Sequence, residues 1–300
     1  METTEIYNQV REHYSAASRT TSIKYGETVA KSFGYSEEEL SSIPQDANLG
    51  LSCGNPLAIT SLKDGETVID LGSGAGFDIF LAASKIGPSG KAIGIDMNDD
   101  MLSRAEKIKT ARSITNASFV KGQITAVPLE SEIADLIISN CVVNLVPHAE
   151  KHLVFKEMYR LLKPGGRVAV SDILAKQPLP EKLRNDIALY VGCIAGAAEV
   201  KEYETWFAEA GFKDVVISDT KADLNVYLET NDDGTRKGDC YAPPGTAEEK
   251  ASSSCCQPAA KSNVSSCCTP ASVPDNASES EERPDLNEFV GSYKIYAVKN

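Results

Sequence analysis

The chain has 300 residues, of which 42% are hydrophobic, and a formal net charge of −13. This length fits one large or two small domains, and the apolar share can fill a core. The negative charge argues against a nucleic-acid partner, because phosphates repel such a surface. The sequence has no run of about 18 apolar residues, which excludes a membrane span, and its first residues do not resemble a secretory signal. We therefore expect a cytoplasmic protein whose cysteines are mostly reduced, without a structural disulfide framework.

Residues 1–66 are predicted to form a helical cap that also carries a segment of the substrate site. A helix is expected within 5–14. Ser36 precedes three glutamates, which is typical of a helix N-cap with acids in the first turn. A short helix is expected at 57–62, just before the first strand.

Residues 68–78 read Val-Ile-Asp-Leu-Gly-Ser-Gly-Ala-Gly-Phe-Asp and predict a strand, a tight glycine turn and a helix. Glycine lets the backbone adopt positive φ and approach a ligand closely. The free N–H groups at the helix start favour an electron-rich partner. The spacing is Gly-x-Gly-x-Gly, which differs from that of dinucleotide folds and of phosphate-binding P-loops.

A second strand at 91–96 ends in Asp96. A carboxylate at this place can accept hydrogen bonds from both ribose hydroxyls of a nucleoside. A turn with a capping acid and no ligand explains each feature alone, but together they predict a nucleoside-containing cofactor.

From Thr67 to Asp219, predicted strands and helices alternate, which indicates a parallel sheet with helices on both faces. Ligands of such sheets lie at the carboxyl ends of the strands. Four residues fall at these ends: Gly72, Asp96, Asn140 and Asp172. Strands are predicted at 67–71, 91–96, 117–121, 134–139, 166–172 and 213–218, and helices notably at 99–112, 148–163 and 201–210.

Residues 229–287 differ in composition from the rest of the chain. Ser, Ala, Pro and Asp dominate, and large aliphatic residues are nearly absent. Such a segment cannot bury enough apolar surface to offset its ordering entropy, so we expect disorder. Residues 288–300 alternate with period two and predict a final strand.

The glycine loop, Asp96 and the segment Leu161-Leu-Lys-Pro-Gly-Gly-Arg-Val-Ala-Val170 resemble, in order, the landmarks of class I S-adenosylmethionine-dependent methyltransferases. The resemblance implies an α/β fold with a seven-stranded Rossmann-like sheet, mostly parallel, whose last strand forms a hairpin with the sixth and inserts antiparallel. It places the glycines beside the methionine moiety, Asp96 on the ribose, and Met97 with Gln123 and Ile124 around the adenine. The expected cofactor residues are Asp70, Gly72, Gly74, Gly76, Asp96, Met97, Gln123, Ile124 and Asn140.

This fold implies a division of the chain beyond residue 66. The S-adenosylmethionine-binding core is expected at 67–178. A substrate-side segment with the sixth strand follows at 179–228, then the disordered insertion at 229–287, within a mixed C-terminal part that ends in the final strand. Loop closure costs grow only logarithmically with length, so a long insertion in this hairpin costs little stability.

Three cysteines, Cys53, Cys141 and Cys193, lie in loop-like contexts that can surround one crevice. They can be small buried hydrophobes. A catalytic Cys–His pair is a weaker option because histidines are few, and zinc lacks a Cys-x-x-Cys pair. Three converging thiolates suit a soft ion that binds three sulfurs and keeps a lone pair, as trivalent arsenic does. The lone pair is then the nucleophile, and no general base is needed.

The blocks Gly50-Leu-Ser-Cys-Gly-Asn-Pro56, Ile138-Ser-Asn-Cys-Val-Val-Asn-Leu145 and Val191-Gly-Cys-Ile-Ala-Gly196 resemble those of arsenite methyltransferases. The resemblance covers roughly 5–228 and 288–299. It implies Cys53, Cys141 and Cys193 as arsenic ligands, methylated arsenicals as detoxification products, and glutathione or thioredoxin as reductant. We expect a monomer. Two departures are the lack of any cysteine in residues 1–52 and Ser52 in place of a common glycine.

The predicted insertion holds Cys240 and two vicinal pairs, Cys255-Cys256 and Cys267-Cys268. They can be incidental, but vicinal thiols are good soft-metal ligands and oxidise easily. We expect the pairs to capture arsenite or to exchange disulfides with the core cysteines. Two other functions stay open from the sequence: methyl transfer to carbon or oxygen of a small molecule, and non-enzymatic binding of thiophilic metals.

Overall fold

The computed structural model of the protein describes residues 2–20, 23–184, 193–229 and 285–300. Seven strands form one sheet in the order β3-β2-β1-β4-β5-β7-β6. Their bounds are β1 Thr67–Leu71, β2 Lys91–Asp96, β3 Ala117–Lys121, β4 Ala134–Asn140, β5 Leu162–Ala175, β6 Val215–Asp219 and β7 Val290–Val298. The first five strands pair in parallel. The last strand, β7, runs antiparallel between β5 and β6, so the predicted seven-stranded sheet is confirmed.

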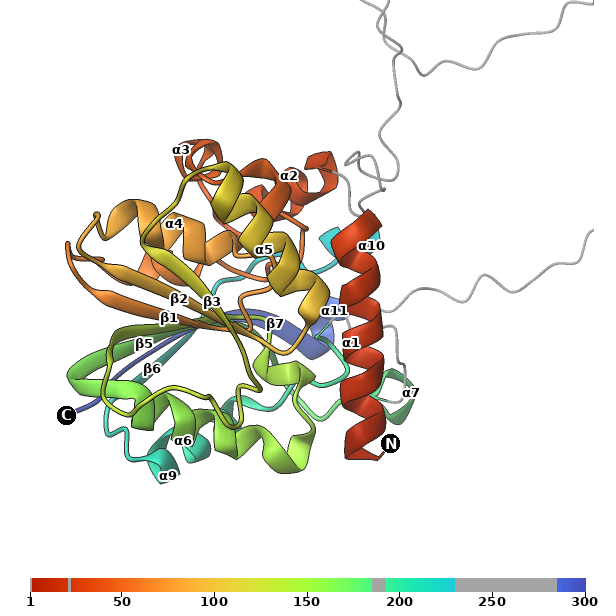
Figure 1. The fold of residues 1–300 in the computed structure, drawn as a ribbon. Coiled ribbons are helices and arrows are strands. Elements are labelled where there is room, and N and C mark those ends of the chain that lie inside the picture. The colour runs from red at the N-terminus through yellow and green to blue at the C-terminus, as the bar shows by residue number, and fades with distance from the viewer. Residues whose placement is uncertain (1, 21–22, 185–192, 230–284) are drawn as a thin grey trace, which may run out of the picture. The chain divides into compact units, whose positions relative to one another are not determined.

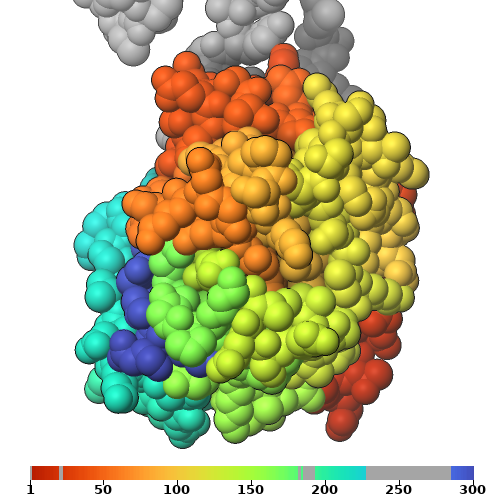
Figure 2. Space-filling model, turned by 60° about the vertical axis from the view of Figure 1, so that its left-hand side comes forward, coloured from red at the N-terminus to blue at the C-terminus, as the bar shows by residue number. Residues whose placement is uncertain are grey.

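The insertion of β7 is visible on the surface that lies away from α1 (Thr3–Thr20). Figure 2 shows the blue C-terminal residues between the green residues near 165 and the cyan residues near 215. The predicted strand at 166–172 is too short, because β5 begins at Leu162, where it pairs with Ala134, and continues to Ala175. The pairing with β7, which reaches Val290, holds this longer strand in register.

Helices cover both faces of the sheet. Figure 1 shows α4 and α5 on one face and α6 and α9 on the other. Among the described residues, the α-helices are α1 Thr3–Thr20, α2 Ile23–Ser32, α3 Glu37–Ser42, α4 Phe77–Lys85, α5 Asp99–Ala111, α6 Lys151–Leu161, α7 Glu181–Arg184, α9 Val200–Ala210, α10 Val226–Glu229 and α11 Leu286–Phe289; the 3-10 helices are η1 Gln45–Ala47, η2 Pro56–Ile59, η3 Val143–Leu145 and η4 His148–Glu150.

Two details differ from the predicted helices. Helix α2 was not predicted. The helix expected at 148–163 is divided, because its first residues form η4 and Leu162 already starts β5. The predicted cap at Ser36 is present, since Ser36 and Glu39 form a reciprocal capping box at the start of α3.

Two apolar clusters hold these layers to the sheet. On one face, Phe155 of α6 stacks edge-on against Phe207 of α9 with ring centroids 4.7 Å apart. On the other, Ile79 and Leu81 of α4 pack with Ile108 of α5. Each such side chain contributes about 1.5–3 kcal/mol when fully buried. Both sheet faces are therefore fixed, and the ends of the strands are held in place.

The segment predicted to be disordered lies, for residues 230–284, outside the described part of the chain. The prediction of disorder is wrong for its last residues, 285–287. Asp285 caps α11 by accepting a hydrogen bond from the Asn287 N–H. Among the described residues, no helix is long and apolar enough to cross a membrane.

Candidate active site

The glycine loop between β1 and α4 combines two kinds of glycine. Gly72, Gly74 and Gly76 all have positive φ, at 83°, 53° and 90°. A Cβ on Gly72 would lie 2.4 Å from the Val142 side chain, and one on Gly76 2.7 Å from Phe119. At Gly74, the nearest atom would be the Met101 sulfur, 3.9 Å away. Packing therefore requires the first and third glycines, whereas the second leaves open space at a pocket.

Asp96, at the end of β2, binds this loop through its carboxylate. One oxygen accepts the Gly74 N–H at 2.8 Å, and the other accepts the Asn98 N–H at 2.8 Å. Burial raises the pKa of Asp96, and these backbone hydrogen bonds partly oppose that rise. The acid predicted to bind a ribose is thus already oriented by the loop.

Two further carboxylates, Asp70 and Asp78, are buried beside the same loop. Burial and the charges of Asp78 and Asp96 raise the pKa of Asp70 well above its usual range. No hydrogen bond reaches the Asp70 carboxylate from the residues that the structure describes. Burial raises the pKa of Asp78 to about 6, although the Tyr35 hydroxyl donates to it at 2.7 Å. Clustered acids of this kind favour a ligand that carries positive charge.

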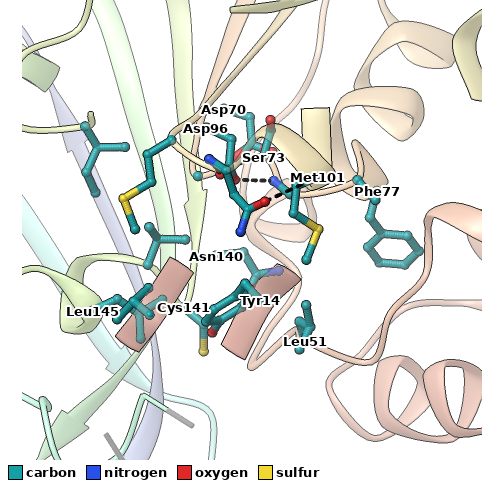
Figure 3. Close-up of a pocket in the computed structure, with 18 of the residues that line it drawn as sticks. Tyr14, Leu51, Asp70, Ser73, Phe77, Asp96, Met101, Asn140, Cys141 and Leu145 are labelled. Carbon is teal, nitrogen blue, oxygen red and sulfur yellow. Dashed lines mark hydrogen bonds between the residues drawn. The ribbon is translucent and has the colours of Figure 1, made fainter. Parts of the chain in front are cut away.

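These residues line one pocket of about 1060 Å³, part of which is open to solvent. Figure 3 shows Asp70, Ser73 and Asp96 on one side of the pocket and Cys141, Leu145 and Tyr14 on the other. Helix α1 contributes Tyr14 and closes the carboxyl end of the sheet. The predicted cofactor residues that line the pocket are Asp70, Gly72, Gly74, Asp96, Met97, Gln123, Ile124 and Asn140, whereas Gly76 packs behind it.

The three predicted cysteines meet at the far side of this pocket. Cys53 and Cys141 are joined by a disulfide, which the expectation of mostly reduced cysteines did not foresee. Sequence composition cannot reveal such a pair, because the two residues come from loops 88 positions apart. Cys193 is a buried free thiol whose S–H donates to the Cys141 carbonyl oxygen at 2.7 Å. All three are buried, and Cys141 itself lines the pocket.

Asn140 connects the pocket with the Cys53 turn. Its side-chain oxygen accepts the Cys53 N–H at 3.2 Å, and its side-chain nitrogen donates to the Gly54 carbonyl at 2.8 Å. The same nitrogen lies 3.1 Å from the Asp78 carboxylate. Asn140 therefore orients a cysteine loop and a pocket acid at once.

The described chain matches the model of a methyltransferase domain over residues 62–211. The chain belongs to the methyltransferase domain family.

Several curated relatives of this methyltransferase carry a more specific name. An arsenite methyltransferase of Halobacterium salinarum is 45% identical over 185 residues, which are 62% of this chain and 47% of that protein. A human arsenite methyltransferase is 35% identical over 154 residues, which are 48% of this chain and 40% of that protein. The methyltransferase thus spans about half the length of the curated relatives it matches.

Solved structures agree on the fold. An arsenic(III) S-adenosylmethionine methyltransferase from Chlamydomonas reinhardtii aligns with a TM-score of 0.54 and 24% identity, covering 91% of this chain and 73% of that one. A phosphoethanolamine N-methyltransferase from Haemonchus contortus aligns with a TM-score of 0.55 and 14% identity, covering 81% and 51%. At these identities, the likeness concerns the fold alone.

Next to the cysteines of this methyltransferase lies a buried polar network that was not predicted from the sequence. The Asp172 carboxylate accepts the Tyr203 hydroxyl at 2.8 Å and the Asn144 side-chain nitrogen at 3.0 Å. Asn144 also donates to the Cys193 carbonyl at 3.2 Å. Lys151 is 1% exposed and donates to the Val143 carbonyl at 2.7 Å. The network holds the segments that carry Cys141 and Cys193 against β5.

Burial shifts the pKa values of the ionisable groups in this network. It raises the pKa of Asp172 to about 6 and lowers the pKa of Lys151 to about 7, while each charge partly stabilises the other. Burial and the Asp172 charge also raise the pKa of the Cys193 thiol, so Cys193 is a protonated thiol before it meets a ligand. The only sequence signal was the strand-end position of Asp172. Tyr203 and Lys151 look like ordinary helix residues.

The remaining predicted ligands, Cys255, Cys256, Cys267 and Cys268, lie outside the described residues, as does Cys240.

Proposed function

We propose that the protein is an arsenite methyltransferase that transfers methyl groups from S-adenosylmethionine to trivalent arsenic held by Cys53, Cys141 and Cys193. Its products are methylated arsenicals, which serves detoxification, and a thiol such as glutathione or thioredoxin is the reductant. One observation carries the proposal: three cysteines from distant loops meet at the wall of the pocket that the glycine loop forms. Thiolates select soft acceptors such as arsenic(III).

The pocket residues fit S-adenosylmethionine. The buried Asp70 carboxylate has no hydrogen-bond donor among the described residues, and the cofactor's ammonium and sulfonium groups are positively charged. Gly74 leaves room for close backbone approach, where a Cβ would project into the pocket. Asp96 would hold the ribose, and Met97 with Ile124 the adenine. When bound, the cofactor supplies an electrophilic methyl group on its sulfonium sulfur.

The chain's own contribution to this reaction is orientation. The thiolates of the three cysteines bind arsenic through sulfur and leave its lone pair free as the nucleophile. The fixed loops around Cys141 and Cys53 direct that lone pair toward the pocket. Because the lone pair carries no proton, the reaction needs no general base. Well-oriented reactants gain up to about 7–11 kcal/mol over free diffusion.

The disulfide between Cys53 and Cys141 is consistent with the electron balance of the proposed cycle. Methylation formally oxidises arsenic from the trivalent to the pentavalent state. Two thiolates return two electrons to arsenic when they form a disulfide, and an external thiol must then reduce that disulfide. The proposed reductant therefore acts on the protein disulfide, and the two electrons reach arsenic through Cys53 and Cys141.

A turnover assay with S-adenosylmethionine, arsenite and glutathione tests the proposal, with arsenic species separated by chromatography and quantified by elemental detection. We expect mono- and further methylated arsenic in the presence of all three components, and none without cofactor. If the cofactor binds but no arsenic product forms, the proposal fails, and the carbon or oxygen atom of a small molecule becomes the better acceptor.

A further inference from the structure

A third potential ligand lies beside the Cys53–Cys141 pair. The sulfur atoms of Cys53 and Cys141 and a carboxylate oxygen of Asp172 all lie within 4.8 Å of one another, and all three residues are buried. A tetrahedral zinc ion with bonds of about 2.3 Å to sulfur separates two thiolates by about 3.8 Å. The Cα atoms of the two cysteines, 5.8 Å apart, allow this separation once the disulfide is open.

We propose that Cys53, Cys141 and Asp172, with both cysteines reduced, form a binding site for a thiophilic divalent cation such as Zn²⁺. Reduction by a thiol adds two electrons and two protons to the disulfide, and the reductant becomes a disulfide itself. The cation then replaces the two thiol protons, which pass to solvent. Two sulfurs and one carboxylate oxygen are ligands that zinc accepts, and they leave one position of a tetrahedral ion open.

Charge balance favours a divalent ion at this position. Two thiolates and the Asp172 carboxylate would carry three negative charges within one buried cluster. Such charges are costly to bury unless a cation compensates them, and a divalent cation neutralises most of this charge. Trivalent arsenic bound to three thiolates is already neutral and leaves Asp172 paired with Lys151.

The hydrogen bonds to Asp172 resemble the outer partners that orient metal-ligating carboxylates. Tyr203 donates to one carboxylate oxygen, and Asn144 and the Ile173 N–H donate to the other at 3.0 and 2.9 Å. Cys193 is not a member of this set, because its thiol is directed to the Cys141 carbonyl. Zinc and arsenite would thus share two ligands and differ in the third, so that zinc competes with arsenite.

The different third ligands give a reciprocal test. In the full chain, Cys240, Cys255, Cys256, Cys267 and Cys268 are replaced by serine to remove other thiols, and the protein is reduced with a phosphine. Zn²⁺ affinity is measured by competition with a chromophoric chelator, and the absorbance of bound Co²⁺ reports thiolate coordination. Arsenite binding is measured on the same samples by protection of cysteine peptides from alkylation.

We expect Asp172→Asn to weaken zinc binding by more than about tenfold, since even outer partners of a metal ligand are worth 10–100-fold. Circular dichroism of the same variant shows that it folds, and its arsenite affinity should fall less than its zinc affinity, because Asp172 only positions the cysteine segments for arsenite. Cys193→Ser should show the reverse pattern, with zinc binding kept and arsenite binding lost. Asp172→Cys, which supplies a third thiolate, should bind zinc at least as tightly as the parent.

The proposal is overturned if the reduced parent binds no zinc, or if Asp172→Asn leaves its zinc affinity unchanged. It is also overturned if Cys193→Ser weakens zinc binding as much as Asp172→Asn does. Zinc binding that depends on Asp172, in a protein that does not bind arsenite, would support this site while refuting the proposed arsenic chemistry.

Discussion

The two sides of the pocket are built in different ways. The centre of the cofactor side comes from one short stretch, in which the Gly74 N–H reaches the Asp96 carboxylate only 22 residues on. The cysteine side joins three loops, from Cys53 to Cys193, and depends on Asp172 and Tyr203 from further elements. A local motif can thus specify a binding site through backbone geometry, whereas the cysteine side exists only in the folded sheet. Changes on one side should therefore leave the other side intact, except at Asn140, which contacts both the Cys53 turn and Asp78.

The largest effect is expected for Cys141→Ser. We expect arsenic methylation to fall to the detection limit, because this residue contacts both other cysteines and serine is a poor ligand for a soft ion. Cofactor affinity, measured by calorimetry, should remain within about threefold of the wild-type value, since the Asp96 side is untouched. Cys240→Ser is the matched control and should methylate normally. Normal arsenite methylation by Cys141→Ser would refute the ligand model.

The reciprocal change is Asp96→Asn. The amide nitrogen that replaces one carboxylate oxygen cannot accept a hydrogen bond from Gly74 or Asn98. An unsatisfied buried donor costs about 1–3 kcal/mol, so we expect cofactor KM to rise by roughly 10–100-fold with arsenite KM unchanged. Asp99→Asn is the control, because it removes only an exposed ion pair with Lys121, worth at most about 1 kcal/mol. Equal losses in both variants would contradict the proposed role of Asp96.

The buried acids of the cofactor side should also affect stability through pH. The pKa of Asp78 is raised from 3.8 to about 6, so the folded chain holds this proton more tightly than the unfolded chain. Its contribution is therefore full below about pH 4 and is lost as the pH rises through about 6. Relative to wild type, Asp78→Asn should gain about 2 kcal/mol of unfolding free energy between about pH 4 and pH 7.

Urea denaturation of both proteins without cofactor checks this difference. The comparison with wild type removes the contribution of surface acids such as Glu66, whose lowered pKa acts at more acidic pH and with the opposite sign. A stability difference that does not change with pH would show that Asp78 titrates as it does in the unfolded chain.

The contrast also explains which features the sequence could predict. Three features were predicted because each depends on a local pattern in the sequence: the spacing of the glycine turn, the position of Asp96 at the end of a strand, and the alternation of apolar residues in strand β7. The three cysteines were recognised as a set, but the disulfide between two of them was not, because pairing depends on loops that meet only in the fold. Lys151 lies on a helix that looks exposed in sequence, yet it is buried by the turn that follows Cys141.

The smallest expected effect separates backbone conformation from ligand contact on the cofactor side. Gly74 and Gly34 both have positive φ, and a Cβ on either meets no atom closer than 3.9 Å. Alanine in such a conformation costs about 1–2 kcal/mol, so Gly74→Ala and Gly34→Ala should lose similar stability in thermal or urea unfolding. Only Gly74→Ala projects its methyl group into the pocket, so only this variant should raise cofactor KM. If both variants bind the cofactor equally well, then Gly74 is required for the turn alone, and the open space beside it does not contact the ligand.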